Sequence, residues 1–224
     1  MTFTVGLFAA ARQRLASRID ALDLDINLVT FDGEGRFDMD GGTRDASDVE
    51  LDYLWIGPDL AGGDFGALPF DVALKCKRIG VLQTFNAGLD NPAYKVLADR
   101  GVRLCNSSAQ SVAISEYVLA HTLSLIHPID EQRALQHAGT WQRTPFREVA
   151  NSHWLIIGFG PIGRETAVRA KAFGASVSVI RRTRSATDNA DRVGTMADLT
   201  EFVPDADVVV LACALNAETR KLAD

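Results

Sequence analysis

Residues 153–180 read HWLIIGFGPIGRETAVRAKAFGASVSVI, and this stretch decides the fold. Its first five residues, HWLII, are mostly apolar and predict a short strand, which runs directly into the glycine-rich segment 158–163. Residues 164–173 have the pattern of a helix, and residues 176–180 predict a second strand. A strand, a glycine turn, a helix and another strand in this order indicate a parallel sheet covered by helices.

The glycine-rich segment has the spacing G-x-G-x-x-G in the strand–turn–helix context that gives this motif its meaning. Gly158 permits the tight turn, Gly160 lets the backbone approach a pyrophosphate, and Gly163 lets the helix pack closely on the strand. Pro161 suits the first helical turn, where its missing N–H is not needed. Free amides and the positive end of the helix then face an anion. The pattern favours a dinucleotide site over a purely structural turn or a methyltransferase loop.

The residues after the second strand predict which dinucleotide binds. An NAD site usually carries Asp or Glu about 20 residues after the glycines, where it binds the ribose 2′-hydroxyl. This chain has Arg181 and Arg182 there, with Arg184 close by. Guanidinium groups match the geometry of a phosphate, so we expect NADP(H), with NAD as the second choice. A solvated basic loop is the alternative interpretation.

The rest of the chain also alternates between strand and helix patterns. Apolar strand patterns occur at residues 3–8, 26–31, 51–56, 78–85 and 102–105. They predict an α/β fold, with a flavodoxin-like domain over residues 1–105 followed by part of a Rossmann domain over residues 106–224. The second domain includes a long helix at 111–126 and a polar linker.

Two further segments carry expectations of their own. Residues 32–52 are acidic and glycine-rich, but Thr43 occupies the sixth position of a loop that starts at Asp38, where a calcium loop needs glycine. We expect a solvated loop there and no metal site. Residues 208–211 form a continuous apolar run, which predicts a strand buried on both faces.

Composition excludes several classes of protein. The chain has 224 residues, of which 47% are hydrophobic and 23% charged, as in ordinary globular proteins. The net charge of −6 argues against nucleic acid as a partner, and no apolar run is long enough to span a membrane. The cysteines Cys76, Cys105 and Cys213 are scattered and odd in number, so we expect a reducing, cytoplasmic setting.

With these motifs in hand, the chain resembles the D-isomer-specific 2-hydroxyacid dehydrogenases, a family that includes glyoxylate and hydroxypyruvate reductases and phosphoglycerate dehydrogenase. The resemblance extends from about residue 82 to the end. The matching segments are NAGLDN at 86–91, the helix at 111–125, the glycine motif with AFG at 172–174, and residues 207–215, which resemble the third strand of the nucleotide domain.

The resemblance implies roles for individual residues. Backbone amides at Ala87 and Gly88 would hold the carboxylate of a 2-oxo or 2-hydroxy acid, or contact the nicotinamide end of the cofactor. Pro161 and Ile162 would lie on the pyrophosphate. Cys213 would edge the cofactor cleft, or pack as a small hydrophobe in the alternative interpretation.

The resemblance further implies that Arg181 lies at the adenine ribose and that the segment from 111 to 151 forms the arm of a homodimer. The reaction would be hydride transfer between a 2-oxo acid and a D-2-hydroxy acid, with the particular acid left open. The family's catalytic Arg, Glu and His lie C-terminal to the region that Thr219 matches, so we expect them beyond Asp224.

None of the chain's histidines has the context of the family's acid/base. They are His121, His127, His137 and His153. We therefore expect that the 224 residues alone bind NADPH weakly and turn over little substrate, as a fragment or a natural truncation. The alternative is a non-catalytic dinucleotide-binding module that acts as a sensor or interaction protein.

Overall fold

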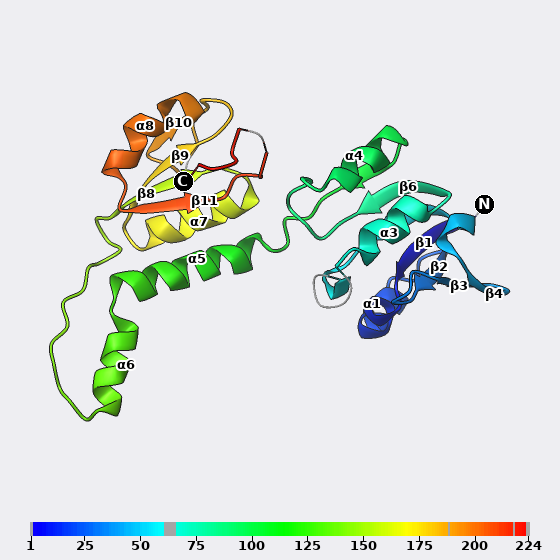
Figure 1. Ribbon diagram of the computed structural model, residues 1–224, viewed down its shortest axis with the longest axis horizontal. Coiled ribbons are helices and arrows are strands. Elements are labelled where there is room, and N and C mark those ends of the chain that lie inside the picture. The colour runs from blue at the N-terminus through cyan, green and yellow to red at the C-terminus, as the bar shows by residue number, and fades with distance from the viewer. Residues whose placement is uncertain (1, 61–65, 188, 217, 223–224) are drawn as a thin grey trace. The chain divides into compact units, whose positions relative to one another are not determined.

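The computed structural model describes residues 2–60, 66–187, 189–216 and 218–222. The chain divides into two compact units, Met1–Ser107 and Ser108–Asp224, and each is described by itself (Figure 1).

The first unit is built on a seven-stranded sheet in the order β4-β3-β2-β1-β5-β6-β7. Its strands are β1 (Phe3–Phe8), β2 (Ile26–Phe31), β3 (Phe37–Met39), β4 (Gly42–Arg44), β5 (Glu50–Trp55), β6 (Arg78–Gln83) and β7 (Arg103–Cys105). The five strands other than β3 and β4 are parallel, and their order is that of flavodoxin-like folds. The α/β fold class is therefore confirmed.

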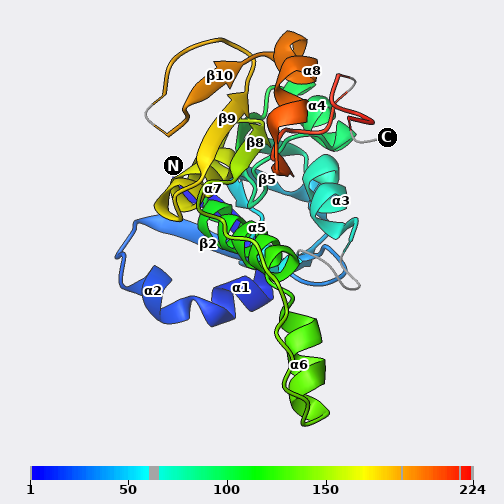
Figure 2. The same cartoon turned by 90° about the vertical axis from the view of Figure 1, so that its left-hand side faces the viewer.

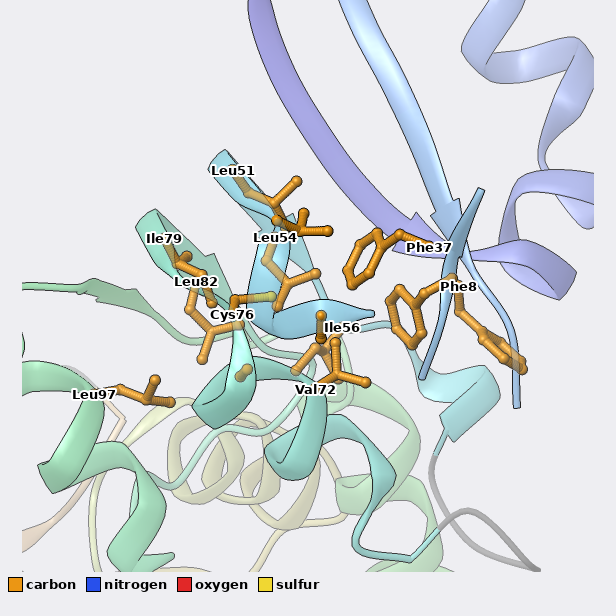
Figure 3. Close-up of a cluster of buried hydrophobic side chains, with 14 of the residues drawn as sticks. Phe8, Phe37, Leu51, Leu54, Ile56, Val72, Cys76, Ile79, Leu82 and Leu97 are labelled. Carbon is orange, nitrogen blue, oxygen red and sulfur yellow. The ribbon is translucent and has the colours of Figure 1, made fainter. Parts of the chain in front are cut away.

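Short helices connect these strands. They are α1 (Ala9–Arg14), α2 (Ala16–Asp20), α3 (Leu68–Lys75) and α4 (Pro92–Asp99), with 3₁₀ turns at Ala46–Asp48 and Pro58–Leu60. Figure 3 shows the core of this unit, where side chains from α3 pack against those of β5 and β6. Leu51, Leu54 and Leu82 are fully buried there, and burial of each such side chain contributes about 1.5–3 kcal/mol.

The acidic segment is only partly a loop, so the expectation for residues 32–52 is wrong at its centre. Strands β3 and β4 form an antiparallel hairpin there, and β3 pairs with β2. The reason is Phe37, which is fully buried; the centroids of its ring and the ring of Phe31 are 5.4 Å apart. One buried aromatic side chain draws the segment onto the edge of the sheet, while Asp38 and Asp40 remain on the surface.

The second unit has a four-stranded parallel sheet in the order β10-β9-β8-β11. Its strands are β8 (His153–Ile157), β9 (Ser176–Ile180), β10 (Arg192–Gly194) and β11 (Val208–Leu211). In chain order this is 3-2-1-4, the order of the first strands in a Rossmann fold. Its helices are α5 (Ser111–Ile126), α6 (Ile129–His137), α7 (Pro161–Ala172) and α8 (Leu199–Phe202), with 3₁₀ turns at Met196–Asp198 and Val203–Asp205.

Two expectations for this sheet need correction. The short strand β10 was not expected, so β11 is the fourth strand of the unit and not the third. Burial of β11 on both faces is also wrong, because Val209 and Leu211 are 46% and 52% exposed. Successive side chains of a strand alternate between faces, and only Val210 is buried, in the cluster that contains Trp154.

Helix α5 packs along α7, whereas α6 continues beyond the end of α5 and away from the sheet of its own unit (Figures 1 and 2). The sequence indicated only a polar linker there, because α6 buries none of its residues. Among the described residues, no single helix is long and apolar enough to cross a membrane. Helices α5 and α6 pass that test only as a pair, and the pair bends by 60° between them.

Candidate dinucleotide-binding site

The turn between β8 and α7 needs glycine at two positions for reasons internal to the fold. Gly158 has a φ of +98°, and a Cβ there would lie 2.5 Å from the backbone nitrogen of Cys213. A Cβ on Gly163 would lie 2.1 Å from the carbonyl oxygen of Gly158. Both distances are far below van der Waals contact, so the turn and the helix close on each other only with bare backbone at these positions.

Gly160 is different, because nothing in the unit requires glycine there. Its φ is −76°, which other residues adopt readily, and a Cβ built on it meets no atom of the described residues within 4 Å. The space beside its backbone is open. Close approach of a ligand to the main chain, as a pyrophosphate makes in this kind of turn, would explain why this position is glycine.

The first turn of α7 is free to bind an anion. Gly160 is the N-cap residue and no side chain caps the helix, so the amides of Ile162 and Gly163 gain no side-chain acceptor. Pro161 occupies the first helical position and contributes no N–H. Unsatisfied amides and the helix dipole together favour negative charge at this point.

Phe159 joins the glycine turn to the end of β9. Its ring is buried, and the guanidinium carbons of Arg164 and Arg181 lie 5.9 and 6.0 Å from the ring centroid. The backbone N–H of Arg181 donates to the carbonyl of Gly194 at 3.0 Å, which continues the β9–β10 ladder. The structure therefore brings Arg181 beside the glycine turn, and its role at the adenine ribose remains a prediction.

The other two arginines differ in their surroundings. Arg182 is exposed and forms no ion pair with any described residue, whereas Arg184 pairs with Asp198. Asp198 also accepts hydrogen bonds from the backbone N–H of Thr195 at 2.7 Å and from its hydroxyl at 3.0 Å. The hydrogen bond from Arg184, followed by those from Thr195, lowers the pKa of Asp198 to about 2.

The sequence interpretation missed Asp198. A signal was available, because Thr195 and Asp198 stand three residues apart and form a capping box at the start of the 3₁₀ turn. Without the fold, however, nothing in that spacing connects the capping box to the arginines after β9.

Cys213 follows β11 and is half-buried. It packs against the cluster of Leu155, Ile157 and Ile180, while its backbone lies directly under Gly158. The side chain therefore behaves as a small packed hydrophobe in this unit, and its backbone helps to shape the turn. Contact with a cofactor remains a prediction for this residue.

Ala87 and Gly88 belong to the loop after β6 in the first unit. The side-chain amide of Asn106 donates to the carbonyl of Ala87 at 2.8 Å, and Asn86 donates to the hydroxyl of Tyr94 at 3.2 Å. These bonds hold the loop, while the N–H groups of Ala87 and Gly88 donate to no acceptor among the described residues. Two adjacent free amides can bind a carboxylate.

The histidines have other surroundings. His153 starts β8, where its ring nitrogens contact the hydroxyls of Ser176 and Ser178 at 2.8 and 2.9 Å. That end of the sheet is opposite to the glycine turn. His121 lies on the exposed side of α5, His127 stacks on a ring in the linker, and His137 ends α6. In the described part of the chain, no three His, Cys, Asp or Glu side chains gather as a metal site would require.

Comparison with known proteins identifies the second unit. Residues 119–224 match the family model described as D-isomer specific 2-hydroxyacid dehydrogenase, NAD binding domain. The second unit is thus similar to the NAD-binding domain of the D-isomer specific 2-hydroxyacid dehydrogenases. Members of this family are oxidoreductases, and the resemblance seen in the sequence is confirmed.

Curated relatives of this dehydrogenase family match at low identity. D-3-phosphoglycerate dehydrogenase of Methanocaldococcus jannaschii is 26% identical over 157 residues, which cover 68% of this chain and 30% of the relative. Glyoxylate reductase of Thermococcus gammatolerans is also 26% identical, over 63% of this chain and 46% of its own length. The chain thus spans less than half the length of these relatives.

Solved structures agree on the fold. A family member from Aeromonas salmonicida superposes with a TM-score of 0.74 at 24% identity, over 97% of this chain and 66% of its own. The NADPH-dependent glyoxylate/hydroxypyruvate reductase of Sinorhizobium meliloti, solved with NADP and sulfate, gives 0.72 at 18% identity, over 98% and 65%.

Proposed function

We propose that the chain is the coenzyme-binding part, together with a substrate domain, of an oxidoreductase that interconverts a 2-oxo acid and a D-2-hydroxy acid with a preference for NADP(H). One observation carries the proposal: Gly160 sits beside open space with an ordinary φ, at the start of an uncapped helix. The fold does not require glycine here, so the missing side chain is best explained by a diphosphate that lies against the backbone and accepts hydrogen bonds from the free amides.

The described residues divide the binding of a nicotinamide dinucleotide among them. The amides of the first turn of α7, with Pro161 and Ile162 beside them, bind the diphosphate. Arg181 and Arg182 bind the 2′-phosphate, since no carboxylate stands at the end of β9 to bind a free ribose hydroxyl. The NADP complex of the Sinorhizobium reductase supports this choice of coenzyme.

Residues 1–105 serve as the substrate domain in this proposal. The free amides of Ala87 and Gly88 orient the carboxylate of the 2-oxo acid, and the dinucleotide, when bound, supplies the hydride. This assignment follows the resemblance of the NAGLDN loop and the geometry of its backbone.

We also propose a cytoplasmic homodimer. The segment around α5 and α6 exposes large apolar side chains, among them Leu125 at 87% and Trp141 at 91%. Exposed apolar surface of this kind is typical of an interface between subunits. The three cysteines are free, which supports a reducing compartment.

Fluorescence titration of the 224-residue protein with NADPH and NADH tests the choice of coenzyme. We expect tighter binding of NADPH. In the double variant Arg181→Ala with Arg182→Ala, the ratio of the affinities for NADPH and NADH should fall about tenfold, or about 1.4 kcal/mol. Arg147→Ala, which removes a cation that pairs with Asp207 at the end of the sheet opposite to the glycine turn, serves as the matched control. Equal affinity of the unaltered protein for the two coenzymes would refute the NADP assignment.

A non-catalytic dinucleotide-binding role is the second candidate, because no described histidine lies at the end of the sheet that carries the glycine turn. Reduction of glyoxylate and hydroxypyruvate by the purified 224 residues distinguishes the two roles. We expect slow or no turnover alongside measurable binding of NADPH, and rapid reduction would contradict this expectation.

A further inference from the structure

The arginine loop after β9 is fastened at both ends. At its start, the backbone N–H of Arg181 donates to the carbonyl of Gly194. At its end, the guanidinium of Arg184 pairs with Asp198. Between these two points lies Arg182, which is exposed. Residues 181–184 are therefore a short loop with a tether on each side and, in the middle, Arg182, which pairs with no described residue.

The tether at Arg184 has one fixed partner and one flexible partner. The side chain of Asp198 is only 16% exposed, and both hydrogen bonds from Thr195 hold its second oxygen. Arg184 is 64% exposed and comes from the loop. Because Asp198 is anchored in the 3₁₀ turn, it determines where the guanidinium of Arg184 lies.

We propose that Asp198 is a positioning residue for binding of the coenzyme's 2′-phosphate. It holds Arg184 away from the phosphate and thereby fixes the loop in which Arg181 and Arg182 point toward it. This inference rests on the NADP preference proposed above. It assigns the three arginines different roles: two bind the anion, and the third orders the loop.

Electrostatics alone predicts the opposite effect of Asp198. A carboxylate near a bound phosphate repels it, so its removal would strengthen binding, and the released Arg184 would add a further cation. If Asp198 acts by ordering the loop, its removal weakens binding, because the phosphate must then order the loop itself. The sign of the change therefore separates the two explanations.

The experiment uses the full 224-residue protein and two half-molecules that differ only in the 2′-phosphate, namely 2′,5′-ADP and 5′-AMP. Calorimetric titration gives the affinity for each without any turnover. For Asp198→Asn we expect about tenfold weaker binding of 2′,5′-ADP and a change of less than about twofold for 5′-AMP. Asp198→Glu, which keeps the charge, should restore part of the loss.

The matched control is Asp205→Asn. It removes a carboxylate of the same region that pairs with Arg192 at 3.3 Å and makes no ion pair with residues 181–184. We expect it to leave both affinities unchanged. A thermal unfolding curve of each variant shows whether the protein remains folded.

Tighter or unchanged binding of 2′,5′-ADP by Asp198→Asn would overturn the inference, as would an equal loss for both ligands in a folded protein. A different result would overturn the proposed coenzyme: if the unaltered protein bound 2′,5′-ADP no better than 5′-AMP, the NADP preference itself would fail. If Asp198→Asn does not fold, Asp198→Glu and Arg184→Met decide together. A preference for 2′,5′-ADP over 5′-AMP that is intact in Asp198→Glu and lowered in Arg184→Met supports the tether. An unchanged preference in Arg184→Met overturns it.

Discussion

Replacing Gly160 by alanine separates the demands of the fold from those of the ligand. At this position a Cβ meets no atom within 4 Å in the described part of the chain, and the φ of −76° suits alanine. At Gly163 a Cβ would lie 2.1 Å from the carbonyl oxygen of Gly158. The same chemical change, three residues apart in one turn, therefore has opposite consequences for stability.

The magnitudes follow from these contacts. Gly160→Ala should change the free energy of unfolding by less than about 1 kcal/mol and is expected to be slightly stabilising, because alanine restricts the unfolded chain. Gly163→Ala must push α7 away from the turn and should cost about 1–3 kcal/mol or more. For binding, the new methyl of Gly160→Ala occupies the space of a diphosphate oxygen. We expect at least about tenfold weaker binding of NADPH, or about 1.4 kcal/mol.

Urea unfolding followed by circular dichroism measures the first quantity, and quenching of protein fluorescence by NADPH measures the second. If a diphosphate approaches Gly160, the Gly160→Ala variant loses affinity for NADPH and keeps its stability. Normal binding of NADPH by this variant would show that no diphosphate approaches Gly160. A loss of stability as large as that of Gly163→Ala would show that the open space beside Gly160 does not exist.

Three further results are expected. Iodoacetamide should label Cys213 more slowly when NADPH is bound. It should spare Cys76 in the native protein, because burial raises the pKa of the Cys76 thiol to about 12. Mass spectrometry of the labelled peptides measures both rates, and labelling of Cys213 that NADPH does not slow would show that Cys213 does not contact the cofactor. Phe37→Ala should destabilise the first unit by about 3–5 kcal/mol in urea without altering NADPH affinity, and a smaller loss would show that the hairpin is not part of the core. The preference for NADPH over NADH should fall from pH 7 to pH 5, because a phosphate monoester loses its second charge near a pKa of about 6. Asp198 contributes nothing to that fall, because its lowered pKa of about 2 keeps its carboxylate ionised at both pH values. An unchanged preference at pH 5 would therefore argue against recognition of the phosphate.

Local sequence patterns predicted the elements around the glycine turn well. The strands at 153–157 and 176–180 and the helix at 111–126 have the bounds that the sequence indicated. These elements are predominantly apolar segments with glycine or proline near their ends, so the local signal and the tertiary environment agree.

Elements with weak local signals were missed. The strand β10 has only three residues, Arg192–Gly194, and it forms by pairing with β9, which no local pattern reveals. The hairpin at β3 and β4 depends on burial of Phe37 beneath an acidic surface. In both cases a partner distant in the chain supplies the hydrogen bonds or the contacts that the segment itself lacks.

The sequence by itself determined the α/β class, the glycine turn and the absence of a carboxylate after β9, because each depends on residues close together in the chain. Only the tertiary structure separated Gly160 from Gly158 and Gly163, since the difference lies in which backbone atoms surround a missing Cβ. It also divided the arginines, because Arg184 meets its carboxylate only when the turn after β10 folds back beside the end of β9. Hydrophobic period and turn residues are recorded locally, whereas steric fit and charge pairing depend on which distant atoms the fold brings together.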